Sequence, residues 1–424
     1  MNNLIELLNA NTGVSDWKIN THWKESYELF FVKGKLETVR CTDTCDTEVT
    51  VYVDHGEFKG DAQFFVYPSD QEAQIETKIQ EAVEKALLIR NKSYTLPGDQ
   101  SGEFAVESNF AEFEPAELAA VIANTVFDAN AVENGSLNSV EIFINRHTQS
   151  IRNSRKLHKT QIRYDAMVEA IPTYNGSQES VELYEQYNFS SLDADALHRE
   201  IADKMAEVKA RYEAVKPDHE IDCPVVLNAL ELSDLFRNIA YDLNYASIYS
   251  HSNLFSRGDA IQEEITGDPI GITMAGQVTG SVRSSAFDGD GLTLGQIRIV
   301  DEGKAVNYFG SNRYGQYLGE EPTGNLGCMV VDAGSADLAD LFGCNCLEVI
   351  SMSGLQVDFF SDYIGGEIRL AYLYENGKVT PVTGISISGK LTEILPSIRL
   401  SNRTIVRDGY SGPDKALLTG MKIF

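Results

Sequence analysis

The hydrophobic pattern of the chain changes near Glu220, and this change limits the folds that the chain can adopt. Between Glu28 and Tyr67, four β-forming runs, ELFFV, LETVRC, EVTVYV and AQFFVY, are separated by turn residues such as HGEFKG. They predict a β-meander joined by hairpins. Beyond Pro224 the chain is rich in glycine and in short alternating runs such as QIRIV and VTGISIS, with a hairpin signal at Asn376-Gly377. The two halves therefore need separate cores.

Helical periodicity separates the halves further. A helix is predicted after Ser69, which has capping-box spacing to Glu72, and another begins at Pro115, a favourable first helical residue. The remaining predicted elements of this region are strands at Val140–Ile144 and Gln161–Ile171, a helix from about Leu192 to Val215, and a helix from about Leu232 to Leu243.

These patterns predict an α+β fold. A chain of 424 residues is expected to form about two or three domains. We place an N-terminal mixed α/β domain, a β-meander with packed helices, at residues 1–220. A β-rich, barrel-like C-terminal domain follows at residues 221–424, with the boundary between Asp218 and Cys223.

The charge balance and the cysteine content narrow the function classes. With 35 basic and 63 acidic residues, the formal net charge of -28 opposes long-range attraction to nucleic acid or anionic lipid. The start, MNNLIELLNANTGVSDW, lacks the pattern of a signal peptide, and no segment is apolar enough to span a bilayer. We therefore expect a cytoplasmic protein that does not enter the membrane, with its six cysteines reduced.

The stretch LHREIADKM places a histidine close to a glutamate on the long predicted helix. Glu200 lies two residues after His198, roughly 200° around the helix, so the two side chains point apart. A zinc motif of the HExxH kind needs a second histidine where this chain has Ala202. The pattern therefore favours a histidine at the boundary of an amphipathic helix.

Other motifs fall short of known binding or catalytic patterns. GISISGKL nearly matches a phosphate-binding loop, but Leu391 replaces the hydroxyl residue that would contact magnesium. FDGDGLTLG offers Asp288 and Asp290, yet Leu292 stands where a calcium loop needs an oxygen ligand, so a glycine-rich turn is the better interpretation. The cysteines, including Cys328, are expected to be buried small side chains rather than nucleophiles.

One basic run stands out from the acidic background. RHTQSIRNSRKLHKTQIR, from Arg146 to Arg163, carries six lysines and arginines but lacks interleaved aromatic residues for base stacking. It could bind an anionic partner or nucleic acid. A hairpin with a charged, solvent-exposed face is the favoured interpretation.

Longer segments resemble a known family. SSAFDGDGLTLGQIRIVDEGKAVNYFGSNRYGQYLGEEPTGN and LEVISMSGLQVDFFSDYIGGEIRLAYLYENGKVTPVTGISISGKLTEILPSIRLSNR resemble the C-terminal domain of the TldD/TldE (PmbA) family, long labelled as candidate modulators of DNA gyrase. The turn at Phe287–Gly291, the run at Pro322–Asn325 and the hairpin at Glu375–Lys378 fall in the family's order. In the first half, YELFFVKGKLETVRC, the helix after Ser69 and IRNS at Ile151–Ser154 resemble that family's N-terminal domain.

The resemblance implies a peptidase-related protein of two domains, in which one branch binds zinc through HExxxH on a helix and a cysteine near the C-terminus. The matching helix here reads LFRNIAYDL, with Arg237, Asn238 and Asp242 in place of the first ligand, the general base and the second ligand. A guanidinium cannot ligate zinc, an amide cannot take a proton from water, and no cysteine follows Cys346. The resemblance therefore implies the metal-free branch, with no catalytic residue, metal or cofactor of its own.

The same helix can also be explained without a substrate. Its apolar stripe is Leu232, Leu235, Phe236, Ile239 and Leu243. Asn238 and Asp242 lie on an adjacent flank, which is either a solvated helix face or a polar wall of a groove in a dimer. In the second case Arg237, Asn238 and Asp242 would contact a peptide.

Three functional hypotheses follow. The leading one is a non-catalytic subunit of a heteromeric metallopeptidase that acts on peptides or unfolded segments, paired with a zinc-bearing TldD-like relative. The alternative is a homodimeric peptide-binding protein without hydrolytic activity. The third, a direct effector of DNA gyrase or DNA, rests on the family label and the basic run, and the net charge opposes it.

Overall fold

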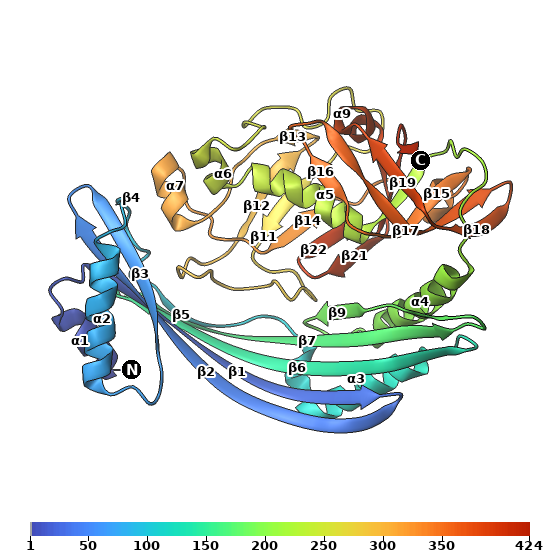
Figure 1. Ribbon diagram of the computed structural model, residues 1–424. Helices are drawn as coiled ribbons and strands as arrows, with labels where there is room; N and C mark the ends of the chain where they lie inside the picture. The colour runs from blue at the N-terminus through green and yellow to red at the C-terminus, as the bar shows by residue number, and fades with distance from the viewer. Residues whose placement is uncertain (1) are drawn as a thin grey trace.

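A long curved sheet built by the N-terminal half of the chain, residues 2–213, lies beneath the C-terminal half, residues 225–424 (Figure 1). The computed structural model describes residues 2–424. In the described chain, no helix combines the length and the apolar character that crossing a membrane requires.

The N-terminal sheet has the order β4-β3-β2-β1-β6-β7-β5, and both β8 and β9 pair with β7. β1, β2, β3, β6 and β7 join through antiparallel pairs, whereas β5 runs parallel to β7. The strands are β1 (Asp16–Val32), β2 (Lys35–His55), β3 (Phe58–Val66), β4 (Asn91–Lys92), β5 (Ser101–Ala105), β6 (Gly135–Asn153), β7 (His158–Asn175), β8 (Ser180–Glu182) and β9 (Glu185–Phe189).

The two faces of this sheet differ in polarity because side chains alternate along each strand. Trp17, Ile19 and Leu29 of β1 are buried in two apolar clusters that the helices of this half cover. On the opposite face, Lys18 forms an ion pair of 2.8 Å with Asp290 of the C-terminal half. The helices are α1 (Asn2–Ala10), α2 (Glu72–Ala86), α3 (Pro115–Asp128), α4 (Ala194–Glu213) and the 3₁₀ turn η1 (Asn109–Glu112).

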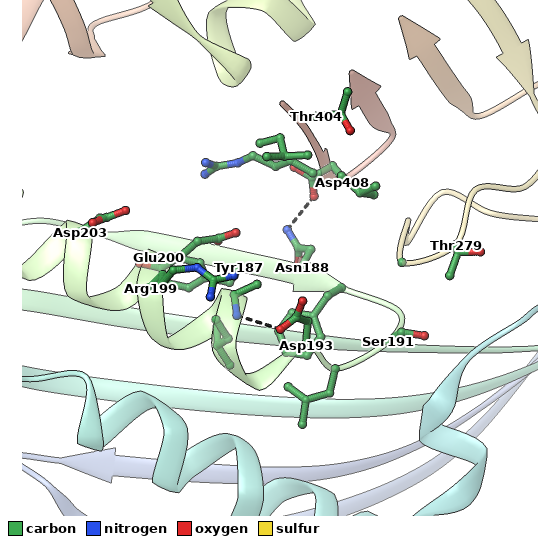
Figure 2. A pocket seen from close by; sticks show the side chains of 18 of the residues that line it. Tyr187, Asn188, Ser191, Asp193, Arg199, Glu200, Asp203, Thr279, Thr404 and Asp408 are labelled. Atoms are coloured by element: carbon green, nitrogen blue, oxygen red, sulfur yellow. Dashed lines mark hydrogen bonds between the residues drawn. The ribbon is translucent and has the colours of Figure 1, made fainter. Parts of the chain in front are cut away.

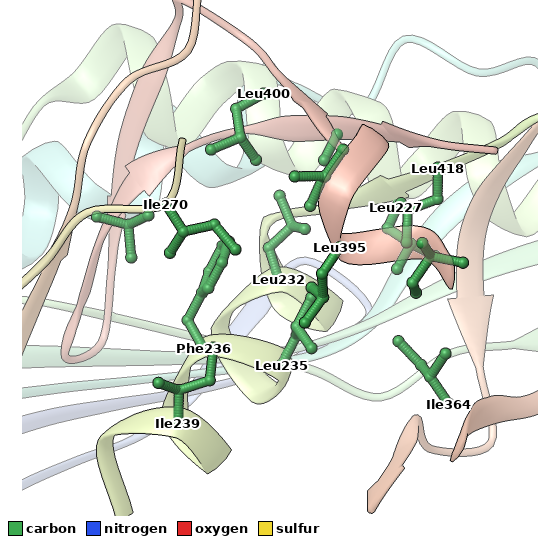
Figure 3. Close-up of a cluster of buried hydrophobic side chains, with 14 of the residues drawn as sticks. Leu227, Leu232, Leu235, Phe236, Ile239, Ile270, Ile364, Leu395, Leu400 and Leu418 are labelled. Atoms are coloured by element: carbon green, nitrogen blue, oxygen red, sulfur yellow. The ribbon is translucent and has the colours of Figure 1, made fainter. Parts of the chain in front are cut away.

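The C-terminal half contains two sheets with helix α5 (Ala229–Asp242) in the core between them. Phe236, Leu232 and Leu235 of α5 pack into one cluster with Leu227, Leu395 and others from both sheets (Figure 3). The first sheet has the order β20-β23-β10-β15-β17-β19-β24 with β16 and β18 on β17, and the second has the order β13-β12-β11-β14-β22-β21.

The bounds of these elements are as follows. The strands are β10 (Val225–Asn228), β11 (Ile272–Ala275), β12 (Gln296–Asp301), β13 (Lys304–Ala305), β14 (Cys328–Val331), β15 (Cys346–Met352), β16 (Gln356–Asp358), β17 (Tyr363–Glu375), β18 (Lys378–Val382), β19 (Ile385–Gly389), β20 (Arg399–Leu400), β21 (Thr404–Arg407), β22 (Tyr410–Pro413), β23 (Lys415–Leu418) and β24 (Lys422–Ile423). The helices are α6 (Tyr245–Ser250), α7 (Asn312–Leu318), α8 (Leu338–Leu341), α9 (Leu391–Ile394) and the turn η2 (Leu395–Ser397).

The α+β class predicted from the sequence is confirmed, and the arrangement of the C-terminal half differs from a barrel. Among residues 2–424, the end strands β20 and β24 do not pair with each other, nor do β13 and β21, so both sheets stay open. The helix α5 fills the space that a closed barrel would enclose.

Contacts at both ends of the curved sheet tie the two halves together. After α4, the amide of Val215 donates to the carbonyl of Pro381, and the amide of Thr383 donates to the carbonyl of Val215, at 3.1 Å each. At the far end, the Arg313 guanidinium of α7 lies 5.9 Å from the ring centre of Tyr94 and 5.6 Å from that of Tyr317. The boundary predicted at 218–223 falls between α4 and β10.

Candidate functional site

The flank of α5 singled out by sequence is occupied by contacts within the chain. Arg237 donates to the Ser233 hydroxyl at 3.1 Å, and the Asn238 side-chain amide donates to the Asp234 carbonyl at 2.9 Å. Both carboxylate oxygens of Asp242 accept backbone N–H groups of the following loop, from Leu254 at 2.7 Å and Phe255 at 2.8 Å. Asp242 therefore organises the loop after α6.

The zinc that one branch of the resembled family binds does not fit this donor set. A guanidinium and an amide nitrogen are not zinc ligands, and the lone pairs of Asp242 face two amide protons. Burial raises the pKa of Asp242, against the effect of those two N–H groups. Within residues 2–424, no three His, Cys, Asp or Glu side chains converge as a metal site would require.

A hollow of about 690 Å³ lies between the two halves of the chain, and we call it the inter-half hollow (Figure 2). Its floor comes from β9 and from the start of α4, and its roof from β21 and the turn that follows. Two contacts between the halves border it: the Asn188 side chain donates to Asp408 at 3.0 Å, and the Ser190 amide donates to the Gly280 carbonyl at 3.1 Å. The volume is in the usual range for a ligand pocket, about 300–1,000 Å³.

The inter-half hollow borders strand edges rather than sheet faces. It is lined by consecutive residues, 186–189 of β9 and 403–408 around β21. Successive side chains of a strand point to opposite faces of the sheet. A hollow that borders every consecutive residue of a strand therefore lies along the edge of that strand, not over one face of the sheet. Over residues 2–424, β9 pairs only with β7 and β21 only with β22, so each has one free edge.

Polar groups in and behind the inter-half hollow lack partners. The hydroxyl of Tyr187, a residue only 5% exposed, and the Glu231 oxygen Oε2 make no hydrogen bond with any atom of residues 2–424. Arg407 forms no ion pair with a described residue, although Glu200, Glu231 and Tyr187 all lie within range of its charge. A ligand in the inter-half hollow would find an unmatched guanidinium, whereas the Tyr187 hydroxyl and the Glu231 oxygen are buried in the protein interior.

Burial governs the titration of the acidic groups around the inter-half hollow. It raises the pKa of Glu231, at the start of α5, to about 7, and Arg407 and Lys204 oppose this only in part. Burial also raises the pKa of Glu200 and of Asp203. Of these three carboxylates, only that of Glu231 is removed from solvent, because Glu200 and Asp203 are exposed at the surface.

Sequence reasoning missed this site. Its parts come from segments about 220 residues apart, such as Asn188 and Asp408, and none belongs to a known motif. One signal was present: Asp408-Gly409 closes a two-residue hairpin between β21 and β22, the kind of turn that marks paired strands.

The other motifs have structural roles. His198 is exposed on α4, on the solvent side of the boundary position predicted from the sequence. The Asp288 carboxylate accepts the amides of Asp290, Leu292 and Asn325 at 3.0 Å each, which joins the FDGDG turn to the PTGN run. Burial raises the pKa of Asp288. The predicted glycine-rich turn is thus held together by an internal carboxylate.

The basic run from Arg146 to Arg163 forms the end of the β6–β7 hairpin, and much of its charge is used inside the chain. Arg146 pairs with Glu25, and Arg155 donates to Asp16 at 3.0 Å. Lys159 is buried and donates to the Gly291 carbonyl and the Thr293 hydroxyl of the C-terminal half. The run therefore helps to seat one half on the other.

Two histidines distant in sequence meet on the polar face of the N-terminal sheet. His22 Nε2 lies 2.9 Å from His147 Nδ1, the rings stack at 5.1 Å, and His147 Nε2 lies 2.5 Å from Asp165. Burial lowers the pKa of His22, and the neighbouring His147 lowers it further. The sequence spacing of the histidines gave no sign of this chain of hydrogen bonds.

Comparison with known proteins places these observations in context. Residues 220–423 match the family model of the PmbA/TldA metallopeptidase C-terminal domain. The fold is similar to that of TldE from Thermococcus kodakarensis, at 16% identity and a TM-score of 0.79 over 100% of this chain and 99% of that one. It is also similar to a candidate modulator of a DNA gyrase from Thermotoga maritima, at 15% identity and a TM-score of 0.78 over 100% and 99%.

A third solved structure, a candidate modulator of DNA gyrase from Bacteroides thetaiotaomicron, is similar at 14% identity and a TM-score of 0.78, over 99% of this chain and 97% of that one. No curated protein matches the sequence. The structural likeness covers both halves, whereas the family model covers the C-terminal half.

Proposed function

Since the chain belongs to the PmbA/TldD family through residues 220–423, we propose that it is the non-catalytic, metal-free subunit of a cytoplasmic metallopeptidase that acts on peptides or unfolded segments. Its partner is a relative that carries the HExxxH zinc motif. In this assembly the partner supplies the activated water, and this chain helps to enclose and order the peptide.

One observation carries the proposal. At the position that the resemblance matches to HExxxH, Arg237 and Asn238 are engaged by their own helix, and both oxygens of Asp242 hold the loop at Leu254 and Phe255. The helix thus has a complete structural role without a metal. Its opposite side forms the centre of the C-terminal core, which explains why a helix is kept there.

The test is cleavage of an unfolded peptide by this protein, by its zinc-bearing relative, and by a mixture of the two. We expect no cleavage by this protein alone, no stoichiometric zinc bound to it, and faster cleavage by the mixture than by the relative. A chelator should abolish the activity of the mixture. Chelator-resistant cleavage by this chain alone would overturn the proposal.

The second candidate is a homodimeric peptide-binding protein without hydrolysis, which the free strand edges of the inter-half hollow favour. A cleavage rate that stays unchanged in the mixture, together with peptide binding by this chain alone, would select it.

The gyrase label of two similar structures gains no support from the basic run, because Arg146, Arg155 and Lys159 are engaged within the chain.

A further inference from the structure

The free edge of β21 has a definite set of backbone groups available for pairing. Asp408 and Gly409 form the loop between β21 and β22, so Arg407 and Tyr410 are the closing pair of the hairpin. In such a hairpin the closing pair exchanges hydrogen bonds, and bonded and non-bonded pairs alternate from there. The N–H and C=O groups of Val406 therefore point away from β22.

Two neighbours support this register. Thr404, the next outward-pointing residue, lies opposite Pro413, which has no N–H to offer across the pair. Ser411, opposite Val406, uses its outer side to pair with Val330 of β14. The outward groups of Val406 and Thr404 have no equivalent strand beside them among residues 2–424, because β21 ends its sheet.

Unpaired strand edges are usually shielded by charge, by short length or by a covering segment. Here the edges of β21 and β9 both border the same inter-half hollow, so they are sheltered from other proteins but not paired. The shape that fits beside such an edge is a single extended strand, which gains backbone hydrogen bonds whatever its sequence.

The charges that line the inter-half hollow favour a segment that carries a carboxylate. Arg403 pairs with Asp414, whereas Arg407 has no anionic partner in the described chain. Glu200 on α4 and Tyr187 on β9 line the same hollow and lie within range of its charge. A guanidinium without a partner is suited to a carboxylate, which it can bind through two parallel hydrogen bonds.

We propose that the inter-half hollow receives an extended segment of an unfolded polypeptide, which pairs with the free edge of β21 while Arg407 binds a carboxylate of that segment. This inference rests on the proposed peptide-handling function and names the site in this chain. The carboxylate can come from an acidic side chain or from the C-terminus of the segment.

The test measures binding of a short unstructured peptide of Gly, Ser, Thr and Val with one central Glu, labelled with a fluorophore, to this protein alone. Val406→Pro removes the outward N–H, and Val406→Ala is its matched control because it keeps that N–H. We expect Val406→Pro to weaken binding by about tenfold or more and Val406→Ala to change it by less than about twofold. Circular dichroism and thermal unfolding check that both variants fold.

A second arm tests the carboxylate. Arg407→Gln should weaken binding of the Glu peptide with a free C-terminus. A peptide that lacks the carboxylate bound by Arg407 should bind the native protein and the Arg407→Gln variant equally well. A Gln-for-Glu peptide and a C-terminally amidated peptide separate the two sources.

Equal affinities of the Val406→Pro and Val406→Ala variants would overturn the inference, as would the absence of peptide binding at millimolar concentration. The outcome is independent of the cleavage test. If the mixture with the zinc-bearing relative does not cleave while the peptide still binds at β21, the proposed function fails and this site stands. If the mixture cleaves while Val406→Pro has no effect on binding or on the rate, the site fails and the function stands.

Discussion

The flank of α5 and the inter-half hollow are both polar surfaces, yet they differ in what they leave unmatched. On the flank, Arg237, Asn238 and Asp242 are each bonded to a nearby group of the chain. In the inter-half hollow, Tyr187 and Arg407 have no such partner within residues 2–424. Polar residues at a family's motif position can therefore become structural, while the capacity to bind lies where buried polar groups stay unsatisfied.

The largest loss of stability is expected from a substitution on the buried side of α5. Phe236 is fully buried in the C-terminal core, so Phe236→Ala should lower the free energy of unfolding by about 3–5 kcal/mol. Urea unfolding measures it. A loss below about 1 kcal/mol would mean that the core closes over the cavity, and α5 would then not be the structural centre that the comparison requires.

The next largest effect concerns Glu231, where α5 approaches Arg407. Its pKa in the folded chain is raised to about 7 from an ordinary value of 4.5, so the folded state keeps a proton that the unfolded state releases between these values. The stability contributed by that proton is present below about pH 4.5 and is lost as the pH rises to about 7.

Glu231→Gln cannot lose this proton. Between about pH 4 and about pH 8, the variant should therefore gain on the order of 3 kcal/mol of stability relative to the native chain. Urea unfolding at both pH values measures the gain, with Glu117→Gln, at an exposed position near the start of α3, as the control. A difference between variant and native chain that does not change with pH would contradict a buried, unmatched carboxylate.

Substitutions on the flank of α5 should have intermediate to small effects on stability. Asp242→Ala removes the acceptor of two backbone N–H groups and should cost about 1–3 kcal/mol. Asn238→Ala, on the exposed side of the same helix, should stay within about 0.5 kcal/mol. Thermal unfolding of the pair checks this order, and equal values would show that Asp242 does not hold the loop.

The smallest effect should be at Tyr187. Because its hydroxyl has no partner in the described chain, Tyr187→Phe should leave the stability unchanged or raise it by up to about 1 kcal/mol. A clear loss of stability in thermal unfolding would reveal a structural partner for the hydroxyl, and the contrast between the flank and the inter-half hollow would weaken.

Much of the fold could be predicted from local patterns. The helix at Pro115, the long helix before Pro217 and the Asn376-Gly377 hairpin are present, since each depends on neighbouring residues alone. The capping box lies at Gln71 and Gln74 instead of Ser69 and Glu72, because α2 begins at Glu72.

Strand lengths were predicted less well. LETVRC and EVTVYV belong to one strand, β2, and β6 continues from the predicted Val140–Ile144 to Asn153. The continuation, NRHTQSIRN, lacks regular hydrophobic alternation. The sheet face that carries it meets the C-terminal half through polar contacts such as that of Gln161 with Ser285, and Ile151 is the apolar residue of the continuation that packs there against Phe287. Where a strand does not border an apolar core, its sequence carries little sign of the strand.

The two candidate sites also differ in how far the sequence could predict them. Arg237, Asn238 and Asp242 were found through a motif position, and their role as groove residues remains a prediction. The inter-half hollow could not be found from sequence, because a free edge exists only once the sheets have assembled and β9 faces β21.

The contacts at the two ends of the curved sheet have a mechanical consequence. At one end Val215 pairs with β18, and at the other end Arg313 contacts Tyr94 and Tyr317. The N-terminal half is therefore an arch that is attached to the C-terminal half at both of its ends. An arch with fixed feet resists hinge opening, which keeps the spacing between β9 and β21 constant. In the proposed function, this constant spacing would admit a single extended strand and exclude any segment that is still folded.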